Sequence, residues 1–121
     1  MSAFAFQFSG VYVPGILDGT KRTTIRARRP RCEIAQTMRF LNGYRPHAQF
    51  AEAQVVSMRQ ITHADITTRI ARDDGFSSLD ELLGALHARY PSVQSFWLVR
   101  WSQPVMRVRR FFQEYHQPTR T

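Results

Sequence analysis

The spacing of hydrophobic residues in the first half of the chain predicts several strands and one short helix. Phe4, Phe6 and Phe8 alternate with small or polar residues, which is the period of a strand with one buried face. After them, Val13, Ile16 and Leu17 share one face of a short helix, with Pro14 in its first turn and Gly19 at its end. Further strands are expected over residues 22–28, over 38–41 before an Asn42-Gly43 turn, and over 48–61, where a long strand has room to bend.

The second half of the chain changes to helical spacing and then returns to a strand. A helix is predicted to begin at Thr62 or His63 and to stop at Gly75. Ser78 followed by Glu81 resembles a capping box, so a second helix is predicted from there to Pro91. Residues 95–101 are apolar and aromatic enough for a central strand. Because strands and helices mix without regular alternation, the pattern favours a small α+β domain.

The length and composition favour one folded domain. The chain has 121 residues, of which 43% are hydrophobic, enough for a core. We expect a domain over residues 1–104 and a basic, aromatic tail or extra strand over 105–121. Cys32 is the only cysteine and has no partner for an internal disulfide, no apolar run of membrane-spanning length occurs, and the opening residues do not resemble a secretory signal. A cytoplasmic protein without a membrane partner is therefore expected.

The charge balance points to an anionic partner. There are 17 basic and 9 acidic side chains, a net charge of +8, and such a field attracts polyanions, of which nucleic acid is the most abundant. Four arginines lie close together around Pro30, and Tyr44 and Arg45 follow a predicted turn that can add base stacking. The candidate nucleic-acid-binding residues are Arg26, Arg28, Arg29, Arg31, Tyr44 and Arg45. A solvated charged loop is the alternative interpretation of this segment.

The only lysine of the chain lies in a second candidate site. Lys21 stands alone among the 17 basic side chains, and a lysine can lose its proton in a suitable pocket, whereas an arginine keeps its own. The turn at Gly19 delivers Lys21, Thr24 and Arg26 within eight residues. Residues three apart in a strand face opposite ways, so Lys21 and Thr24 converge only if Lys21 still lies in the turn. A solvated edge strand is the alternative. The histidines and Cys32 are too widely spaced to predict a metal site, and no cofactor is expected.

Four segments of the sequence resemble the ASCH domain, a member of the PUA-like superfamily. The similarity covers roughly residues 5–102 and includes the G-x-K-x-x-T-I-R element. The segments that carry it are Gly19-Thr20-Lys21-Arg22-Thr23-Thr24-Ile25-Arg26, Met38-Arg39-Phe40-Leu41-Asn42-Gly43-Tyr44, Ala71-Arg72-Asp73-Asp74-Gly75-Phe76 and Tyr90-Pro91. The resemblance implies a small, partly open β-barrel of five or six strands with flanking helices. It also implies a cleft beside the lysine turn and a partner that is RNA or a modified nucleoside.

Some small bacterial proteins of this family are amidohydrolases that remove the acetyl group from N4-acetylcytidine with a threonine, a lysine and a glutamate. The resemblance places Thr24 and Lys21 at the first two positions and Asp74 at the third. Asp74 is one methylene shorter than that glutamate, which retracts the carboxylate by about 1.5 Å. The implied function is therefore an N4-acetylcytidine amidohydrolase with catalytic residues Lys21, Thr24 and Asp74. A non-catalytic RNA-binding module, or a ribonuclease, is the alternative on the same cleft.

The chemistry of such a site makes opposing demands on the lysine. A threonine hydroxyl is a weak nucleophile and needs a neighbouring base, which a neutral lysine can supply. A nearby carboxylate stabilises the ammonium form instead, so Asp74 is better assigned to orienting the lysine or assisting departure of the amine. Arg22 and Arg26 are the cations expected to lower the pKa of the lysine.

Overall fold

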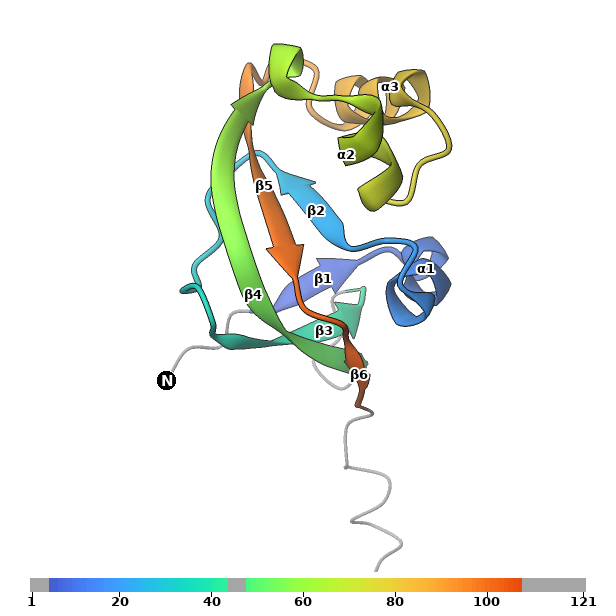
Figure 1. Ribbon diagram of the computed structural model, residues 1–121, viewed down its shortest axis with the longest axis vertical. Coiled ribbons are helices and arrows are strands. Elements are labelled where there is room, and N and C mark those ends of the chain that lie inside the picture. The colour runs from blue at the N-terminus through green and yellow to red at the C-terminus, as the bar shows by residue number, and fades with distance from the viewer. Residues whose placement is uncertain (1–4, 44–47, 108–121) are drawn as a thin grey trace, which may run out of the picture.

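The computed structural model describes residues 5–43 and 48–107, and a strongly curled sheet forms its centre (Figure 1). The strands are β1 (Phe6–Phe8), β2 (Thr23–Arg26), β3 (Thr37–Asn42), β4 (Gln49–Thr62), β5 (Ser95–Trp101) and β6 (Val105–Met106). The helices are α1 (Val13–Asp18), α2 (Thr68–Asp73) and α3 (Leu79–Arg89), with 3-10 turns η1 (Gly10–Tyr12) and η2 (His63–Asp65). The expected α+β class is confirmed.

The long strand β4 is responsible for the curl of the sheet. The strand order is β1-β3-β4-β5-β2, with β6 also paired to β4, and only β1 and β3 run parallel among the paired strands described. The first half of β4 pairs with β3 and β6, while its second half pairs with β5. A register shift between Val55 and Ser57 marks the change. The expected bend in this strand is confirmed, and the sheet is an open half-barrel with β1 and β2 at its edges.

Local sequence signals explain where most of the helices begin and end. Gly19 has φ 88°, a left-handed conformation that glycine adopts readily, and it ends α1 as predicted. Ser78 accepts a hydrogen bond from the Glu81 amide at 3.1 Å at the start of α3, but the Glu81 carboxylate accepts from Ser77, so the capping box is only half formed. The helix predicted from Thr62 begins later, at Thr68.

The late start of α2 has a local cause. Residues 63–65 form the 3-10 turn η2, closed by reciprocal hydrogen bonds between Thr62 and Asp65. Ile66 is then extended, with φ −81° and ψ 123°, so the helix starts afresh with Thr67 as its N-cap. The polar side chains near Thr62 thus stabilise a separate turn rather than the first turn of the helix.

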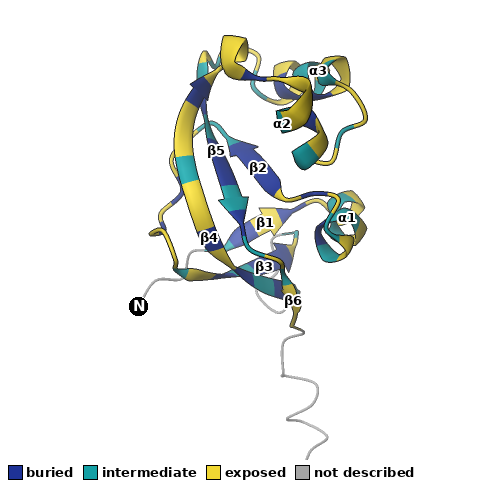
Figure 2. Cartoon of the chain, in the orientation of Figure 1, coloured by how far each residue is buried: buried dark blue, intermediate teal, exposed yellow. Residues whose placement is uncertain are grey.

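The buried residues, dark blue in Figure 2, include two clusters of apolar side chains. One lies inside the curl and contains Phe6, Phe8, Ile16, Met38, Phe40, Val99 and Trp101, among others. The other lies beneath α2 and α3 and contains Ile25, Ile61, Leu82, Leu86, Phe96 and Leu98, among others. Strand β5 contributes to both because Phe96 and Leu98 face one cluster while Val99 and Trp101 face the other.

The segment after the last long strand adds to the sheet before the described residues end. Val105 and Met106 form β6 against Ala51 and Glu52 of β4. Residues 108–121 of the expected tail lie outside the described residues. No described helix is long and apolar enough to cross a membrane.

Candidate functional site

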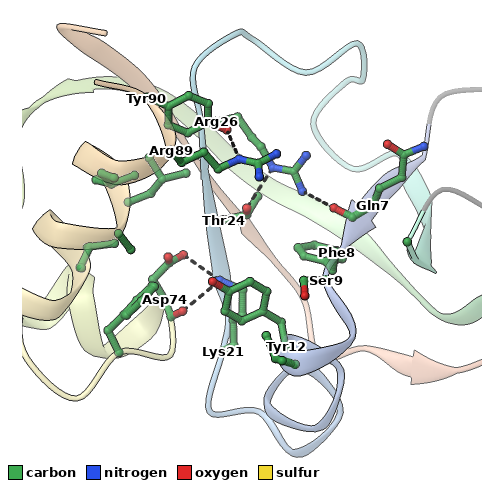
Figure 3. A pocket seen from close by; sticks show the side chains of 17 residues that line it. Gln7, Phe8, Ser9, Tyr12, Lys21, Thr24, Arg26, Asp74, Arg89 and Tyr90 are labelled. Carbon is green, nitrogen blue, oxygen red and sulfur yellow. Dashed lines mark hydrogen bonds and ion pairs between the residues drawn. The ribbon is translucent and has the colours of Figure 1, made fainter. Parts of the chain in front are cut away.

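A pocket of about 350 Å³ lies where the two sheet edges approach the helical layer (Figure 3). Its polar lining includes Lys21, Thr24, Arg26 and Asp74. Aromatic and apolar side chains complete the walls, among them Phe8, Tyr12, Phe76, Leu82, Leu86 and Tyr90. Clefts of about 300 to 1,000 Å³ with a few convergent polar groups are typical binding sites for small molecules. The structure thus brings Lys21, Thr24 and Asp74 to one cavity.

The turn after α1 delivers Lys21 to this pocket. The Lys21 amide donates to the Gly15 carbonyl at 2.9 Å, which folds the chain back over the helix that Gly19 has ended. Lys21 precedes β2 and forms an isolated antiparallel bridge with Asp74. Because Lys21 lies outside the strand, the alternation of β2 does not separate it from Thr24.

Asp74 reaches the pocket from the C-terminal end of α2. Its amide donates to the Ile70 carbonyl at 3.0 Å, and the next residue, Gly75, has φ 92°. A Cβ atom on Gly75 would lie 3.2 Å from Cβ of Lys21. Glycine is therefore needed at this position both for the backbone conformation and for the close approach of the two segments.

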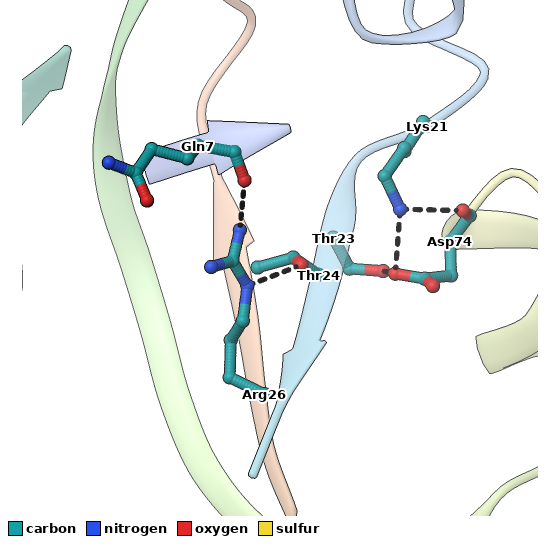
Figure 4. A network of polar contacts seen from close by, with 6 residues as sticks. All are labelled: Gln7, Lys21, Thr23, Thr24, Arg26 and Asp74. Carbon is teal, nitrogen blue, oxygen red and sulfur yellow. Dashed lines mark hydrogen bonds and ion pairs between the residues drawn. The ribbon is translucent and has the colours of Figure 1, made fainter. Parts of the chain in front are cut away.

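Lys21 and Asp74 form a buried ion pair with two contacts (Figure 4). The Lys21 amine donates to the main-chain carbonyl of Asp74 at 2.9 Å and lies 3.3 Å from its Oδ1. Thr23 donates its hydroxyl proton to the same Oδ1 at 2.7 Å. The ring of Tyr12 covers the amine, with its centroid 4.9 Å away. Lys21 is only 5% exposed and Asp74 only 4%.

Burial shifts both members of the pair toward their neutral forms. Loss of hydration lowers the pKa of Lys21; the Asp74 carboxylate works in the opposite direction, and the positive charge of Arg26 adds to the lowering. Burial likewise raises the pKa of Asp74, against the effects of Lys21, Thr23 and Arg26. The site therefore favours a lysine that gives up its proton more readily than a solvated amine does.

Arg26 connects the nucleophile candidate to the opposite sheet edge. Its Nε donates to the Thr24 hydroxyl oxygen at 3.0 Å, and an Nη donates to the Gln7 carbonyl of β1 at 3.1 Å. The guanidinium also stacks on Phe6 and Phe8 at 5.3 and 5.2 Å. Figure 4 shows it spanning from β2 to β1. Arg26 therefore belongs to the pocket and polarises the Thr24 hydroxyl.

The amine and the hydroxyl share the pocket without touching each other. In the part of the chain that the structure describes, the hydrogen bonds of Lys21 Nζ go to Asp74, and none joins it to Thr24. Arg22, expected to act on the lysine, is exposed, and its Nε donates to the Gly19 carbonyl. Arg26 is the arginine that acts on the Lys21 charge.

The remaining arginines of the predicted basic segment lie away from the pocket. Arg28, Arg29 and Arg31 are exposed on the loop after β2, and none of them lines the cavity. The guanidinium of Arg29 lies over Trp97 of β5, 5.6 Å from its centroid. The structure thus separates Arg26 from the other three.

Other candidate groups are placed as follows. Tyr44 and Arg45 lie outside the described residues. Within residues 5–43 and 48–107, no three His, Cys, Asp or Glu side chains cluster as metal ligands would. Cys32 is buried with its sulfur 3.9 Å from Met58 Sδ, and burial raises the pKa of its thiol. Asp73, the neighbour of Asp74, pairs with Arg100 at 2.7 Å.

Comparisons with known proteins bear on the fold. No protein-family model and no curated protein matches the sequence. The structure is similar to that of ASCH from Zymomonas mobilis, with a TM-score of 0.70 and 13% identity over 97% of this chain and 79% of that one. It is also similar to an ASCH domain from Lactobacillus crispatus, with a TM-score of 0.64 and 14% identity over 85% of this chain and 81% of that one.

These similarities establish the architecture of the molecule. The chain has the ASCH-domain fold, a small α+β half-barrel, as the sequence resemblance implied. At this level of identity the likeness concerns the fold.

Replacing Lys21 with methionine removes the cation and leaves Asp74 buried without it. We expect a loss of about 3 to 5 kcal/mol in the free energy of unfolding near neutral pH, because an unpaired buried charge is strongly destabilising. Urea denaturation of Lys21→Met measures this loss. Arg22→Met, which removes the adjacent exposed cation, is the control and is expected to change stability by about 0.5 kcal/mol or less.

The decrease in the free energy of unfolding caused by Lys21→Met should depend on pH. Without the lysine, the pKa of Asp74 in the folded variant is raised above its unfolded value. Stability is then highest at acidic pH, where Asp74 is protonated in both states, and falls as pH rises toward the folded pKa. A loss of equal size at mildly acidic and neutral pH contradicts this account of the pair.

Proposed function

We propose that this chain is an amidohydrolase that removes the acyl group from N4-acetylcytidine or a closely similar nucleoside. The observation that carries the proposal is the convergence of Lys21, Thr24 and Asp74 on one pocket in which burial lowers the pKa of the lysine. The resemblance of the Gly19–Arg26 segment to that of the small bacterial amidohydrolases supports the same assignment.

The pocket suits a nucleoside in size and lining. A volume of about 350 Å³ falls within the range of small-molecule sites. Phe8, Tyr12, Phe76 and Tyr90 supply aromatic surface on which a base can stack. Lys21, Thr24 and Arg26 line the pocket on the side of β2, and an acylated exocyclic nitrogen of the base would bind beside them.

The proposed reaction begins at the Thr24 hydroxyl. Its oxygen attacks the acyl carbonyl carbon while Lys21, in its neutral form, accepts the hydroxyl proton. Catalytic hydrogen bonds commonly tighten only in the substrate complex, which accounts for the separation of amine and hydroxyl in the free protein. Arg26 Nε, already bonded to the Thr24 oxygen, stabilises negative charge as it develops there.

The second half of the reaction releases the nucleoside. The bond between the acyl carbon and N4 breaks, and N4 takes up a proton from the lysine ammonium or through Asp74, giving cytidine. The acyl group remains as an ester on Thr24 until water hydrolyses it to the carboxylic acid. Asp74 orients Lys21 throughout, because it contacts the amine through both its main-chain carbonyl and Oδ1.

Cytidine release from N4-acetylcytidine tests the proposal. Purified protein is incubated with the nucleoside, and cytidine is quantified by chromatography. Thr24→Val keeps the shape of the side chain and removes the nucleophile, so we expect a loss of at least about 100-fold in kcat. Thr24→Ser, which retains a hydroxyl, should keep more activity than Thr24→Val. Cytidine release by the wild type no faster than by Lys21→Ala contradicts the proposal.

A second candidate function rests on the exposed arginine loop. Arg28, Arg29 and Arg31 project from one short loop, and the stacking of Arg29 on Trp97 holds one guanidinium in place. Planar guanidinium groups bind phosphate oxygens in pairs. This surface can bind RNA with or without chemistry in the pocket.

The salt dependence of RNA binding tests this surface. In a single-stranded RNA titration, each lost phosphate contact should flatten the log–log slope by roughly 0.7, so Arg28→Ala with Arg29→Ala should flatten it by roughly 1.4. Arg69→Ala with Arg72→Ala removes the same charge from exposed positions on α2 and is the control. Equal flattening by both double variants, or affinity independent of salt, contradicts a role for the loop.

A further inference from the structure

Thr23 is a buried polar side chain that the proposed reaction does not use. It opens β2, is 1% exposed, and donates its hydroxyl proton to Asp74 Oδ1 at 2.7 Å. The two residues are 51 positions apart in the sequence. The hydroxyl therefore links the edge of the sheet to the end of α2.

This hydrogen bond is the shortest side-chain contact that the structure gives to the Asp74 carboxylate. The shorter contact of Lys21 is to the main-chain carbonyl of Asp74, and the amine lies farther from Oδ1, at 3.3 Å. The main-chain contact does not fix the carboxylate, and of the two contacts to Oδ1 the one from Thr23 is the shorter, at 2.7 Å against 3.3 Å for the Lys21 amine. Figure 4 shows Thr23 and Lys21 approaching Asp74 from different sides.

We infer that Thr23 is a positioning residue, whose hydroxyl holds Oδ1 of Asp74 so that the remaining carboxylate oxygen is presented to the substrate in the pocket. The inference rests on the proposed function, in which Asp74 assists departure of the nitrogen. It gives a physical reason why an aspartate serves where the resembling enzymes have a glutamate. A shorter side chain needs its orientation fixed, and a buried hydroxyl supplies that constraint.

The same hydrogen bond affects the ionisation of Asp74. A donor to the charged form stabilises it, so the Thr23 hydroxyl holds the pKa of Asp74 lower than burial alone would. The charged groups acting on Asp74 are Lys21, before β2, and Arg26, in β2. Tyr12 and Arg89 line the same pocket from η1 and α3, and Asp73, on the same helix, is paired with Arg100. Removing the hydroxyl should therefore raise the pKa of Asp74.

Two variants at this position separate positioning from simple packing. Thr23→Val keeps the shape without the hydroxyl, and Thr23→Ser keeps the hydroxyl. With N4-acetylcytidine as substrate, Thr23→Val should lower kcat by roughly 10-fold to 100-fold with little change in KM, and Thr23→Ser should stay within about threefold of the wild type. The pKa of Asp74, followed by carboxyl NMR of the resting protein, should be higher in Thr23→Val than in the wild type. Thr37→Val, at an exposed position of β3, is the control and should match the wild type.

The outcomes distinguish this inference from the proposed function. If the wild type is active and Thr23→Val keeps its kcat, or loses only folded protein, the inference is wrong and the proposed function stands. If the wild type releases no cytidine, the proposed function fails by itself. Carboxyl NMR of the resting protein, labelled at aspartate, then tests the inference by itself, with the Asp74 signal assigned from the Asp74→Asn variant. A higher pKa of Asp74 in Thr23→Val supports positioning of the carboxylate by Thr23, and an unchanged pKa overturns it.

Discussion

The buried contact between Lys21 and Asp74 connects the two parts of the molecule that form the pocket. Lys21 follows α1 at the edge of the half-barrel, whereas Asp74 ends a helix of the opposite layer, 53 residues later. The Arg22 amide also donates to the Asp73 carbonyl at 2.6 Å, so backbone and side chains join the same two segments. Because this ion pair has so little contact with solvent, removing one partner strongly destabilises the folded protein. The buried contact between Lys21 and Asp74 therefore affects both the shape of the cavity and the pKa of Lys21.

The pocket lies at the open edge of the sheet, between β1 and β2. In a closed barrel β2 would pair with β1, and the hydroxyl of Thr24 would face an interior filled with side chains. Here Arg26 spans the gap with a hydrogen bond to the Gln7 carbonyl, and the cavity reaches around the strand edge. Thr24 and Ile25, from opposite faces of β2, both line it. The cavity thus has room for side chains from β2, from the turn before it and from the end of α2.

Much of the fold could be predicted from the sequence because local signals decide it. Gly19 and Gly75 adopt left-handed conformations, Ser78 caps α3, and the apolar spacing of residues 48–61 marks the bent strand. The start of α2 was not predictable in this way, because Thr62 and Asp65 close a separate turn. At the site, Lys21, Thr24 and Asp74 are recognisable from their motif. The effect of Arg26 on the lysine was also predicted. The contacts of Thr23 with Asp74 and of Arg26 with Gln7 were not, because they join residues 51 and 19 positions apart.

The central claim is that burial makes the Lys21 amine a weaker base than a solvated lysine. Lys21 is the only lysine of the chain, so lysine labelled with ¹³C at Cε gives a single side-chain signal whose pH titration reports this residue alone. We predict a midpoint below the ordinary lysine pKa of 10.5, with the signal of the folded protein observed throughout. A midpoint at or above 10.5 would mean that the Asp74 carboxylate outweighs burial, and it would contradict the assignment of Lys21 as the base.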